Sequence, residues 1–198
     1  MCFFSETPSS IFLVICFGRP EVVCDLKSED VTKKLLCAFV LSRLDYCKSH
    51  LAGCPKYLLS KLQKVQNNAA RLMFRPTRSA HVTPVLHSLH WLSIEQRIEY
   101  KLSLLCFKII SHQAPIYLSE LLNLYTPSRQ LRPSTETRVY RILSFRTMSS
   151  GQRSFSYQAP LTWNQLPVSV RHSTSVSSFK SSLKTFLFLK TFSSVSLP

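Results

Sequence analysis

The sequence predicts a mainly α-helical protein: a small helical domain with one β-hairpin in its C-terminal half. Apolar residues recur every three to four positions over most of residues 29–124 and again over 176–190, which is the period of a helix with one buried face. Only within residues 138–158 does the pattern change, to β-branched and aromatic residues around a Ser-Ser-Gly turn. Hydrophobic residues make up 45% of the 198-residue chain, which is enough for a packed core.

The first helix is expected over residues 29–50. Ser28 is a suitable N-cap, and the acidic pair that follows it places negative charge at the positive end of the helix. Gly53 and Pro55 then terminate this helix, because glycine favours the helix C-terminus and proline cannot continue a helix. The leader before it, residues 1–27, has a short apolar run without a preceding cation, so we expect a poorly ordered segment rather than a targeting signal.

The second helix is expected over residues 55–74, with Pro55 at its first position. When residues are placed at about 100° steps, the apolar side chains fall in one sector, in which Gln66 is the only polar residue. The opposite sector has no acid and consists of cations and amides: Lys56, Lys61, Lys64, Asn67, Asn68, Arg71 and Arg75. A solvated surface helix usually alternates Glu with Lys, since like charges one turn apart are destabilising. The pattern therefore favours a polyanion partner over an ordinary solvent-facing helix.

Four further elements follow along the chain. A short helix is expected from Thr83 to Leu89, and a capping box of Ser93 and Gln96 begins a helix that runs to about residue 112. This helix is apolar nearly all round, apart from a narrow strip with Arg97, Lys101 and Lys108, and is expected to be the buried centre of the fold. Another short helix is expected over 116–124, a hairpin from strands 139–146 and 153–157, and a terminal helix over about 176–190.

Charge and composition exclude several classes of protein. The formal net charge of +15 indicates a polyanion partner, and three glycines are too few for a glycine-rich phosphate loop. The chain has no apolar run of about 18 residues, so no membrane span is expected. Only three aspartates occur, Asp25, Asp30 and Asp45, and they are not clustered as a two-metal polymerase or nuclease requires. No catalytic residue, cofactor or small-molecule substrate is predicted.

The cysteines predict a reduced compartment and no metal site. Their number is seven, which is odd, and their spacing is irregular, unlike that of a disulfide scaffold. A structural zinc site needs four ligands in close pairs, whereas Cys47 and Cys54 are seven residues apart. If zinc were present, these two cysteines and His50 would be its first candidate ligands. We read His87 and His90 as packing and hydrogen-bonding residues, because no nucleophile is nearby in the sequence.

Six stretches resemble one family closely and in the same order. They are residues 41–47 (LSRLDYC), 62–72 (LQKVQNNAARL), 89–98 (LHWLSIEQRI), 114–118 (APIYL), 163–167 (WNQLP) and 179–184 (FKSSLK). Together they resemble the region after the polymerase core in jockey-like non-LTR (LINE-type) retrotransposon reverse transcriptases. The resemblance covers about residues 28–198. It implies a thumb-like helical region over 28–124 and a C-terminal segment over 125–198, whereas residues 1–27 are unmatched, which suggests a truncated copy with unrelated leading sequence.

The resemblance implies binding rather than catalysis. The family polymerises with an aromatic-x-Asp-Asp motif, and this chain has no Asp-Asp pair. In the family, thumb helices grip the backbone of the template and primer, so the implied function is sequence-independent binding of RNA or DNA. The residues expected to contact nucleic acid are Lys56, Lys61, Lys64, Asn68, Arg71, Arg75 and Arg78. The expected location is intracellular, in the nucleus or the cytoplasm.

Two alternatives remain open from the sequence. The chain could be a transposon-derived protein-interaction module, whose helical face binds an unknown partner, or a non-functional relic. Detection of the transcript and of its peptides separates a relic from an expressed protein. A primer-extension assay with a divalent metal separates a binding protein from an enzyme.

Overall fold

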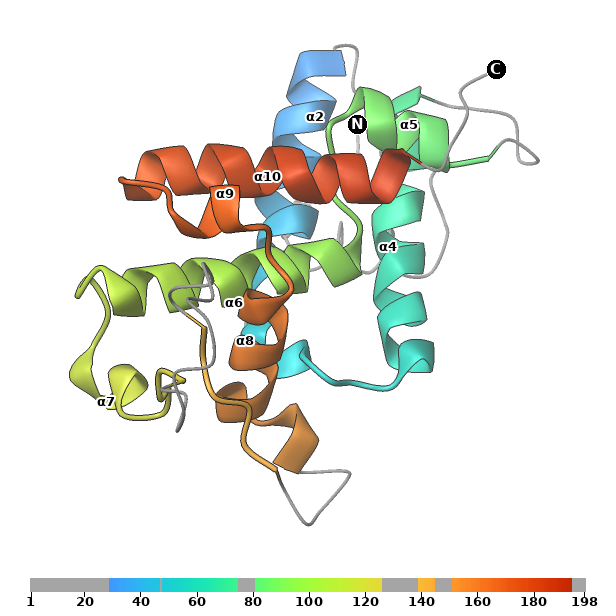
Figure 1. The fold of residues 1–198 in the computed structure, drawn as a ribbon. Coiled ribbons are helices and arrows are strands. Elements are labelled where there is room, and N and C mark those ends of the chain that lie inside the picture. Colours follow the sequence, from blue (N-terminus) through green and yellow to red (C-terminus); the bar gives the residue numbers. More distant parts are fainter. Residues whose placement is uncertain (1–28, 47, 75–80, 126–138, 145–150, 194–198) are drawn as a thin grey trace, which may run out of the picture. The chain divides into compact units, whose positions relative to one another are not determined.

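The computed structural model describes residues 29–46, 48–74, 81–125, 139–144 and 151–193 (Figure 1). In these ranges the secondary structure is helical apart from one isolated β-bridge, which confirms the mainly α fold class. The contacts divide the chain into two compact units. The first contains the described residues of 29–46 and 55–94, and the second contains those of 48–54 and 95–193. The leader that we expected to be poorly ordered, residues 1–27, lies outside the described ranges.

The first unit begins with one helical segment that has a local change of winding. Helix α2 (Glu29–Leu36) continues through a π-helical turn, η2 (Cys37–Leu41), into helix α3 (Ser42–Asp45). Tyr46 then adopts an extended conformation, with φ −68° and ψ 131°. The helix expected to reach residue 50 therefore ends at Asp45, and a separate 3-10 turn, η3 (Lys48–Leu51), belongs to the second unit.

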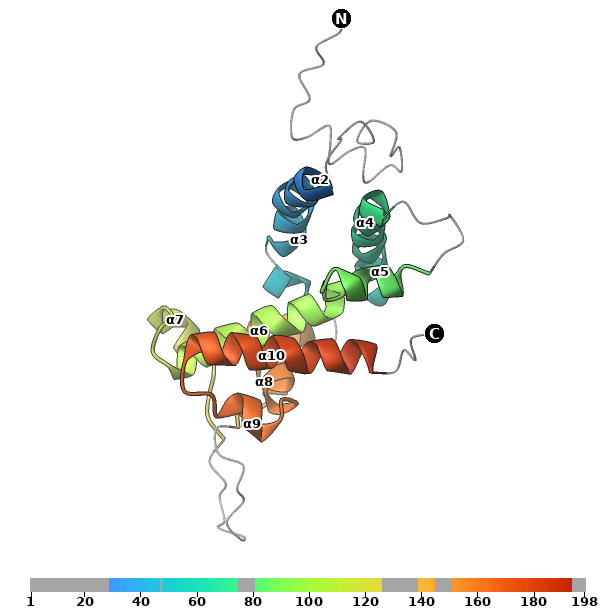
Figure 2. The same cartoon turned by 90° about the horizontal axis from the view of Figure 1, so that it is seen from above.

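Helix α4 (Lys56–Phe74) is the longest element of the first unit and confirms the helix expected over 55–74. It contacts α2, η2 and α5 (Thr83–Ser88), and Figure 2 shows α2 and α4 side by side. Ala69 and Ala70 are fully buried on α4, as is Val40 on η2. Alanine on the packed face lets two helices approach closely, because no long side chain separates their backbones.

The second unit is built around α6 (Ile94–Ile110) and α10 (Val176–Phe192), which run side by side in both views (Figures 1 and 2). The rings of Phe107 on α6 and Phe179 on α10 stack with centroids 4.2 Å apart. Trp163 of helix α8 (Phe155–Asn164) lies 5.8 Å from Phe179 and is fully buried. These aromatic rings form the centre of this unit. Its remaining helical elements are α7 (Ile116–Ser119), η4 (Gly151–Arg153) and α9 (Val168–Arg171).

The predicted hairpin is wrong in its second strand. Residues 153–157 end the η4 turn and begin α8, because Ser154 takes the extended N-cap conformation and the helix that follows buries Ala159 and Trp163. Residues 139–144 pair elsewhere: Tyr140 forms an antiparallel bridge with Leu124. Of the Ser149-Ser150-Gly151 turn expected between the two strands, the two serines lie outside the described ranges and Gly151 begins η4.

The side chain of Asn164 takes the place of a second strand beside Tyr140. Asn164 Nδ2 donates to the Tyr140 carbonyl at 2.8 Å, and Asn164 Oδ1 accepts from the Tyr140 backbone N–H at 3.0 Å. The amide group thus makes both bonds that a neighbouring strand would make.

Within the described residues, no helix is long and apolar enough to cross a membrane.

Candidate nucleic-acid interface

Helix α4 brings together five of the seven residues expected to contact nucleic acid. Lys56, Lys61 and Lys64 are exposed, as the helical spacing predicts. Asn68 and Arg71 are half-buried and engaged with other groups of the protein. The other two expected residues, Arg75 and Arg78, lie outside the described ranges.

One aromatic residue belongs to the same face and was missed from the sequence. Tyr57 is 63% exposed, although tyrosine usually buries most of its ring. It begins a row with steps of three and four residues that we call the α4 row: Tyr57, Lys61, Lys64, Asn68 and Arg71. At about 100° per residue, the row spans roughly 80° of the helix circumference. Tyr57 is overlooked when the residues of the helix are sorted only into cations, amides and apolar residues. Its position four residues before Lys61 nevertheless indicates that it lies on the same face.

The charged residues of α4 are all cations, although the neighbouring helix α2 begins with Glu29 and Asp30. Helix α4 contains no acidic residue, and the first acid after it in the sequence is Glu95. Helix α2, which packs against α4, adds the exposed Lys33 and Lys34 to the same unit. The adjacent lysine pair is a second signal of positive charge that the sequence itself carries. Several like charges in one unit raise the local positive potential and attract polyanions.

The apolar side of α4 is only partly as expected. The most buried positions are Gln66, Ala69 and Ala70, whereas Val65 is half-buried and Leu58 is 36% exposed. Leu58 belongs to the apolar sector that the sequence predicts to be buried, and the structure places it outside the core. The packed line runs through positions 66, 69 and 70, and Leu58 lies roughly 70° away from its centre at 100° per residue.

A polar network fixes α4 against the segment that leads into α6. Gln66 Nε2 donates to the Leu92 carbonyl at 2.8 Å, which satisfies the one polar residue of the apolar sector. Gln63 Nε2 donates to Asn67 Oδ1 at 2.9 Å and to Gln66 Oε1 at 3.2 Å. Because these amides face residues 92–94, the α4 row is held on the outer side of the helix.

The same network replaces the predicted capping box. The Ile94 N–H donates to Gln63 Oε1 at 2.9 Å, so a side chain of α4 binds this free N–H at the start of α6. Gln96 Oε1, which the capping box would place on a backbone N–H, is buried and has no hydrogen-bond partner among the described residues. The capping-box prediction is therefore wrong for its glutamine.

Chemically, the α4 face offers positive charge, amide donors and one aromatic ring. Among the described residues, no three His, Cys, Asp or Glu side chains are grouped closely enough to hold a metal ion. Of the zinc ligands considered from the sequence, His50 and Cys54 are described and Cys47 is not. The positive charge and the amide donors of the α4 face suit it to neutralising an extended polyanion.

Comparison with known proteins leaves the family open. No protein-family model matches the chain, and no match was found among curated proteins or among solved structures.

Proposed function

We propose that this chain is a non-catalytic region of a retrotransposon-derived reverse transcriptase, thumb-like over residues 28–124, that binds the backbone of RNA or DNA through α4. The observation that carries the binding proposal is the set of exposed lysines Lys56, Lys61 and Lys64 on a helix without any acid. The sequence resemblance to jockey-like elements supports the origin. The proposal places the protein inside the cell, in the nucleus or the cytoplasm.

The proposed binding mode is electrostatic. Lysine ammonium groups on phosphates release condensed counterions, so affinity falls as salt rises. Phosphate contacts are the same at every base pair and therefore bind without sequence preference. If Lys56, Lys61, Lys64 and Arg71 all meet phosphates of a duplex, the slope of log K against log salt is roughly −3.6, at about −0.9 per contact. No metal, cofactor or small-molecule substrate is part of the proposal.

Charge reversal on the α4 row tests the proposal. Lys61→Glu with Lys64→Glu changes two exposed side chains, so the fold is retained and circular dichroism should not change. Duplex affinity at low salt should fall at least tenfold, because two attractive contacts become repulsive. The matched control is Lys180→Glu with Lys184→Glu. These two exposed lysines of α10 are also about one helical turn apart, and their replacement makes the same change in net charge. Equal losses from both variants would show diffuse attraction to a cationic chain and would refute an α4 interface.

The non-catalytic part of the proposal has its own test. Primer extension with purified protein, template, deoxynucleotides and Mg²⁺ or Mn²⁺ should give no incorporation, because the chain has no Asp-Asp pair to hold two metal ions. Incorporation that persists after removal of contaminating polymerases would overturn this part.

A second candidate function is a protein-interaction module, and an apolar surface in the second unit favours it. Six large apolar side chains in and after α7 and in the bridged segment are more than 40% exposed: Ile116, Tyr117, Leu121, Leu124, Tyr125 and Ile142. The bridge between Leu124 and Tyr140 brings the two segments together. Exposed apolar clusters of this kind mark association surfaces. Ile116→Ser with Tyr117→Ser should abolish any concentration-dependent self-association in sedimentation while leaving duplex binding unchanged.

A further inference from the structure

A buried arginine in the second unit lacks the partners that its charge requires. Arg171 is the last residue of α9, and only 2% of its surface is exposed. Its Nε and Nη1 atoms are buried and have no hydrogen-bond partner among the described residues. An arginine guanidinium keeps its charge in proteins, so burial cannot be relieved by loss of a proton. Since buried polar groups are nearly always hydrogen-bonded, Arg171 requires an acceptor from outside the chain.

The surrounding elements supply almost no carboxylate. Residues 137–198, which include α8, α9 and α10, contain no acid at all. In the described part of the second unit, the acids are the two glutamates of α6 and Glu120, which follows α7 and is exposed. No partner of opposite charge for Arg171 is therefore encoded near it in the sequence.

The two glutamates of α6 lie at the other end of α10. Glu99 is bound to Lys190 near the end of α10, with Nζ 3.0 Å from Oε2, whereas Phe107 stacks on Phe179 near its start. The two helices are thus antiparallel, and the other glutamate of α6 lies still further from the start of α10. At 1.5 Å per residue, positions 179 and 190 are about 16 Å apart along the helix. Neither carboxylate therefore neutralises charge at the start of α10.

The start of α10 adds positive charge beside α9. Four residues separate Arg171 from this helix, and α9 and α10 are in contact. Ser175 is the N-cap, and its Oγ accepts from the Ser178 N–H at 3.1 Å. The N–H groups of Val176 and Ser177 precede the first intrahelical bond and point out of the same end of the helix. Such an end carries about half a positive charge, and the first turn of α10 contains no acid.

We propose that Arg171 and the first turn of α10 form a binding site for a small oxyanion, namely free phosphate, in the second unit and distinct from the α4 row. A phosphate offers several acceptor oxygens at once. The planar guanidinium donates to two of them, and the N–H groups at the helix start donate to another. The bound anion thus supplies the acceptors that Nε and Nη1 lack and neutralises the buried charge.

The position of Arg171 favours a free ion over the phosphates of a polymer. Its neighbours Ser169 and His172 are exposed, so the guanidinium lies directly beneath the surface. Helix α9 is a single turn of four residues, and a small movement of that turn admits an ion. A nucleic-acid strand would have to displace the whole turn to reach the same nitrogens.

Thermal unfolding in phosphate and in chloride at equal ionic strength tests the site. Phosphate at about ten times its Kd should raise the unfolding temperature of the parent by roughly 3–6 °C. Arg171→Met should unfold at a higher temperature than the parent in chloride, because an unpaired buried charge is removed, and should lose the shift in phosphate. Arg171→Lys keeps the charge without the planar donors and should weaken binding at least tenfold. The matched control is Arg141→Met at an exposed arginine of the same unit, which should keep the full shift.

NMR of protein labelled with ¹⁵N at arginine Nε locates the anion. The Arg171 signal should move and saturate with inorganic phosphate and should stay in place with a short DNA duplex that lacks terminal phosphates. A saturating shift with the duplex would instead make the nucleic-acid backbone the source of the phosphate group. An Arg171 signal that responds to neither, or an equal thermal shift in Arg171→Met, would mean that buried water alone satisfies the guanidinium and would overturn the site. Lys61→Glu with Lys64→Glu should keep the phosphate shift, so loss of the α4 interface and loss of this site are distinguishable.

Discussion

The Gln66 side chain joins α4 to Leu92 through a hydrogen bond of 2.8 Å from Nε2 to the backbone carbonyl, and Gln66 itself is fully buried. A buried amide with its partner in place stabilises modestly, but removal of one partner leaves the other unsatisfied at a cost of about 1–3 kcal/mol. The bond therefore makes Gln66 a structural residue within an otherwise apolar helix side.

Gln66→Met, which keeps the side-chain length, should lower the free energy of unfolding by about 1–3 kcal/mol in urea titrations, because the Leu92 carbonyl loses its donor. Ser60→Ala is the control: Ser60 is exposed and its hydroxyl donates to the Lys56 carbonyl of its own helix, so its cost should be within about 0.5 kcal/mol. Equal stability of Gln66→Met and the parent would refute the structural role.

Tyr57 should contribute to binding of single strands more than of duplexes. An exposed ring in a row of cations can stack on an unpaired base, which is worth about 1–3 kcal/mol per base. Tyr57→Ala should therefore weaken binding of single-stranded RNA or DNA by roughly 5- to 150-fold in fluorescence titrations, by the same estimate. Tyr57→Phe should retain the affinity, because stacking needs the ring and not the hydroxyl. Tyr57→Ala should have only a small effect on duplex binding, because a duplex offers no unpaired base on which the ring can stack.

The long helices could be predicted because their packing faces repeat along the chain. The spacing over 55–74 and 94–112 and the final helix, observed as Val176–Phe192, match the structure to within a few residues. The start of α8 could not be predicted: residues 153–157 are too few to separate a strand period from a helix period. What decides their conformation is the burial of Trp163 further along, against Tyr140 and Phe179.

Non-local contacts limited the prediction of the site in the same way. The lysines of α4 could be found because one helix carries them all. The role of Gln66 depends on Leu92, which is 26 residues away, and the surroundings of Lys48 depend on Arg97 and Lys101 of another element. Neither pairing leaves a periodic trace in the sequence. The nucleic-acid function, the family origin and the division of the chain at residue 124 stay predictions.

Lys48 should make stability rise with pH in a defined window. Its pKa is about 7 in the folded protein and 10.5 in an ordinary lysine, so between these values the unfolded chain binds more protons. The destabilisation of the folded state by the buried charge of Lys48 is therefore complete below pH 7. It disappears as the pH rises toward 10.5. At 1.36 kcal/mol per pKa unit, its upper limit is on the order of 5 kcal/mol.

Lys48→Met removes the titrating amine and so tests whether this amine makes stability rise with pH. The variant should be more stable than the parent at pH 7 in urea titrations, and the difference should shrink by pH 9.5. Other groups titrate in the same window in both proteins, so only the difference between the two is informative. A difference that stays constant with pH would mean that the Lys48 amine titrates as an ordinary lysine.

An added methyl group at Gly53 should destabilise the fold. Its φ is +68°, and a Cβ there would lie 2.9 Å from Gln158 Nε2 and 3.1 Å from the Gln152 carbonyl oxygen. Gly53→Ala should cost about 1–2 kcal/mol from the left-handed backbone alone. Gly151→Ala, at the first residue of the 3-10 turn η4, should be neutral or slightly stabilising because it restricts the unfolded chain. Thermal unfolding of both variants distinguishes backbone strain at Gly53 from a general effect of replacing glycine.

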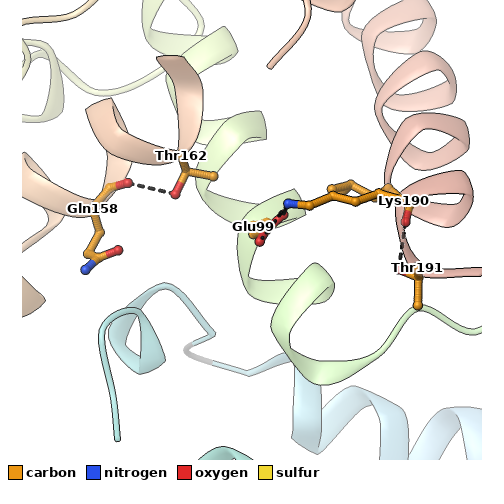
Figure 3. A network of polar contacts seen from close by, with 6 residues as sticks. Glu99, Gln158, Thr162, Lys190 and Thr191 are labelled. Atoms are coloured by element: carbon orange, nitrogen blue, oxygen red, sulfur yellow. Dashed lines mark hydrogen bonds and ion pairs between the residues drawn. The ribbon is translucent and has the colours of Figure 1, made fainter. Parts of the chain in front are cut away.

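The ion pair between Glu99 and Lys190 joins α6 to α10 but should contribute little to stability. Lys190 Nζ lies 3.0 Å from Glu99 Oε2 and 3.3 Å from Oε1, as Figure 3 shows, and the two side chains are 45% and 31% exposed. Exposed pairs of this kind are worth about 0–1 kcal/mol, since water screens the attraction and ordering two long side chains costs entropy. Lys190→Gln should therefore lower the free energy of unfolding by less than about 1 kcal/mol, and added salt should shrink the effect further.

A comparison of Phe179→Ala with Lys190→Gln tests whether aromatic packing or the ion pair holds α6 and α10 together. Phe179 is fully buried and stacks on Phe107 of α6, so Phe179→Ala removes apolar contact and leaves a cavity in the second unit. Substitutions of this kind cost about 3–5 kcal/mol. We therefore expect Phe179→Ala to lower the urea midpoint several times more than Lys190→Gln, with no dependence of the Phe179→Ala effect on moderate salt. If Lys190→Gln were the more damaging change, the contact between α6 and α10 would be electrostatic, and the aromatic stack would not be the centre of the unit.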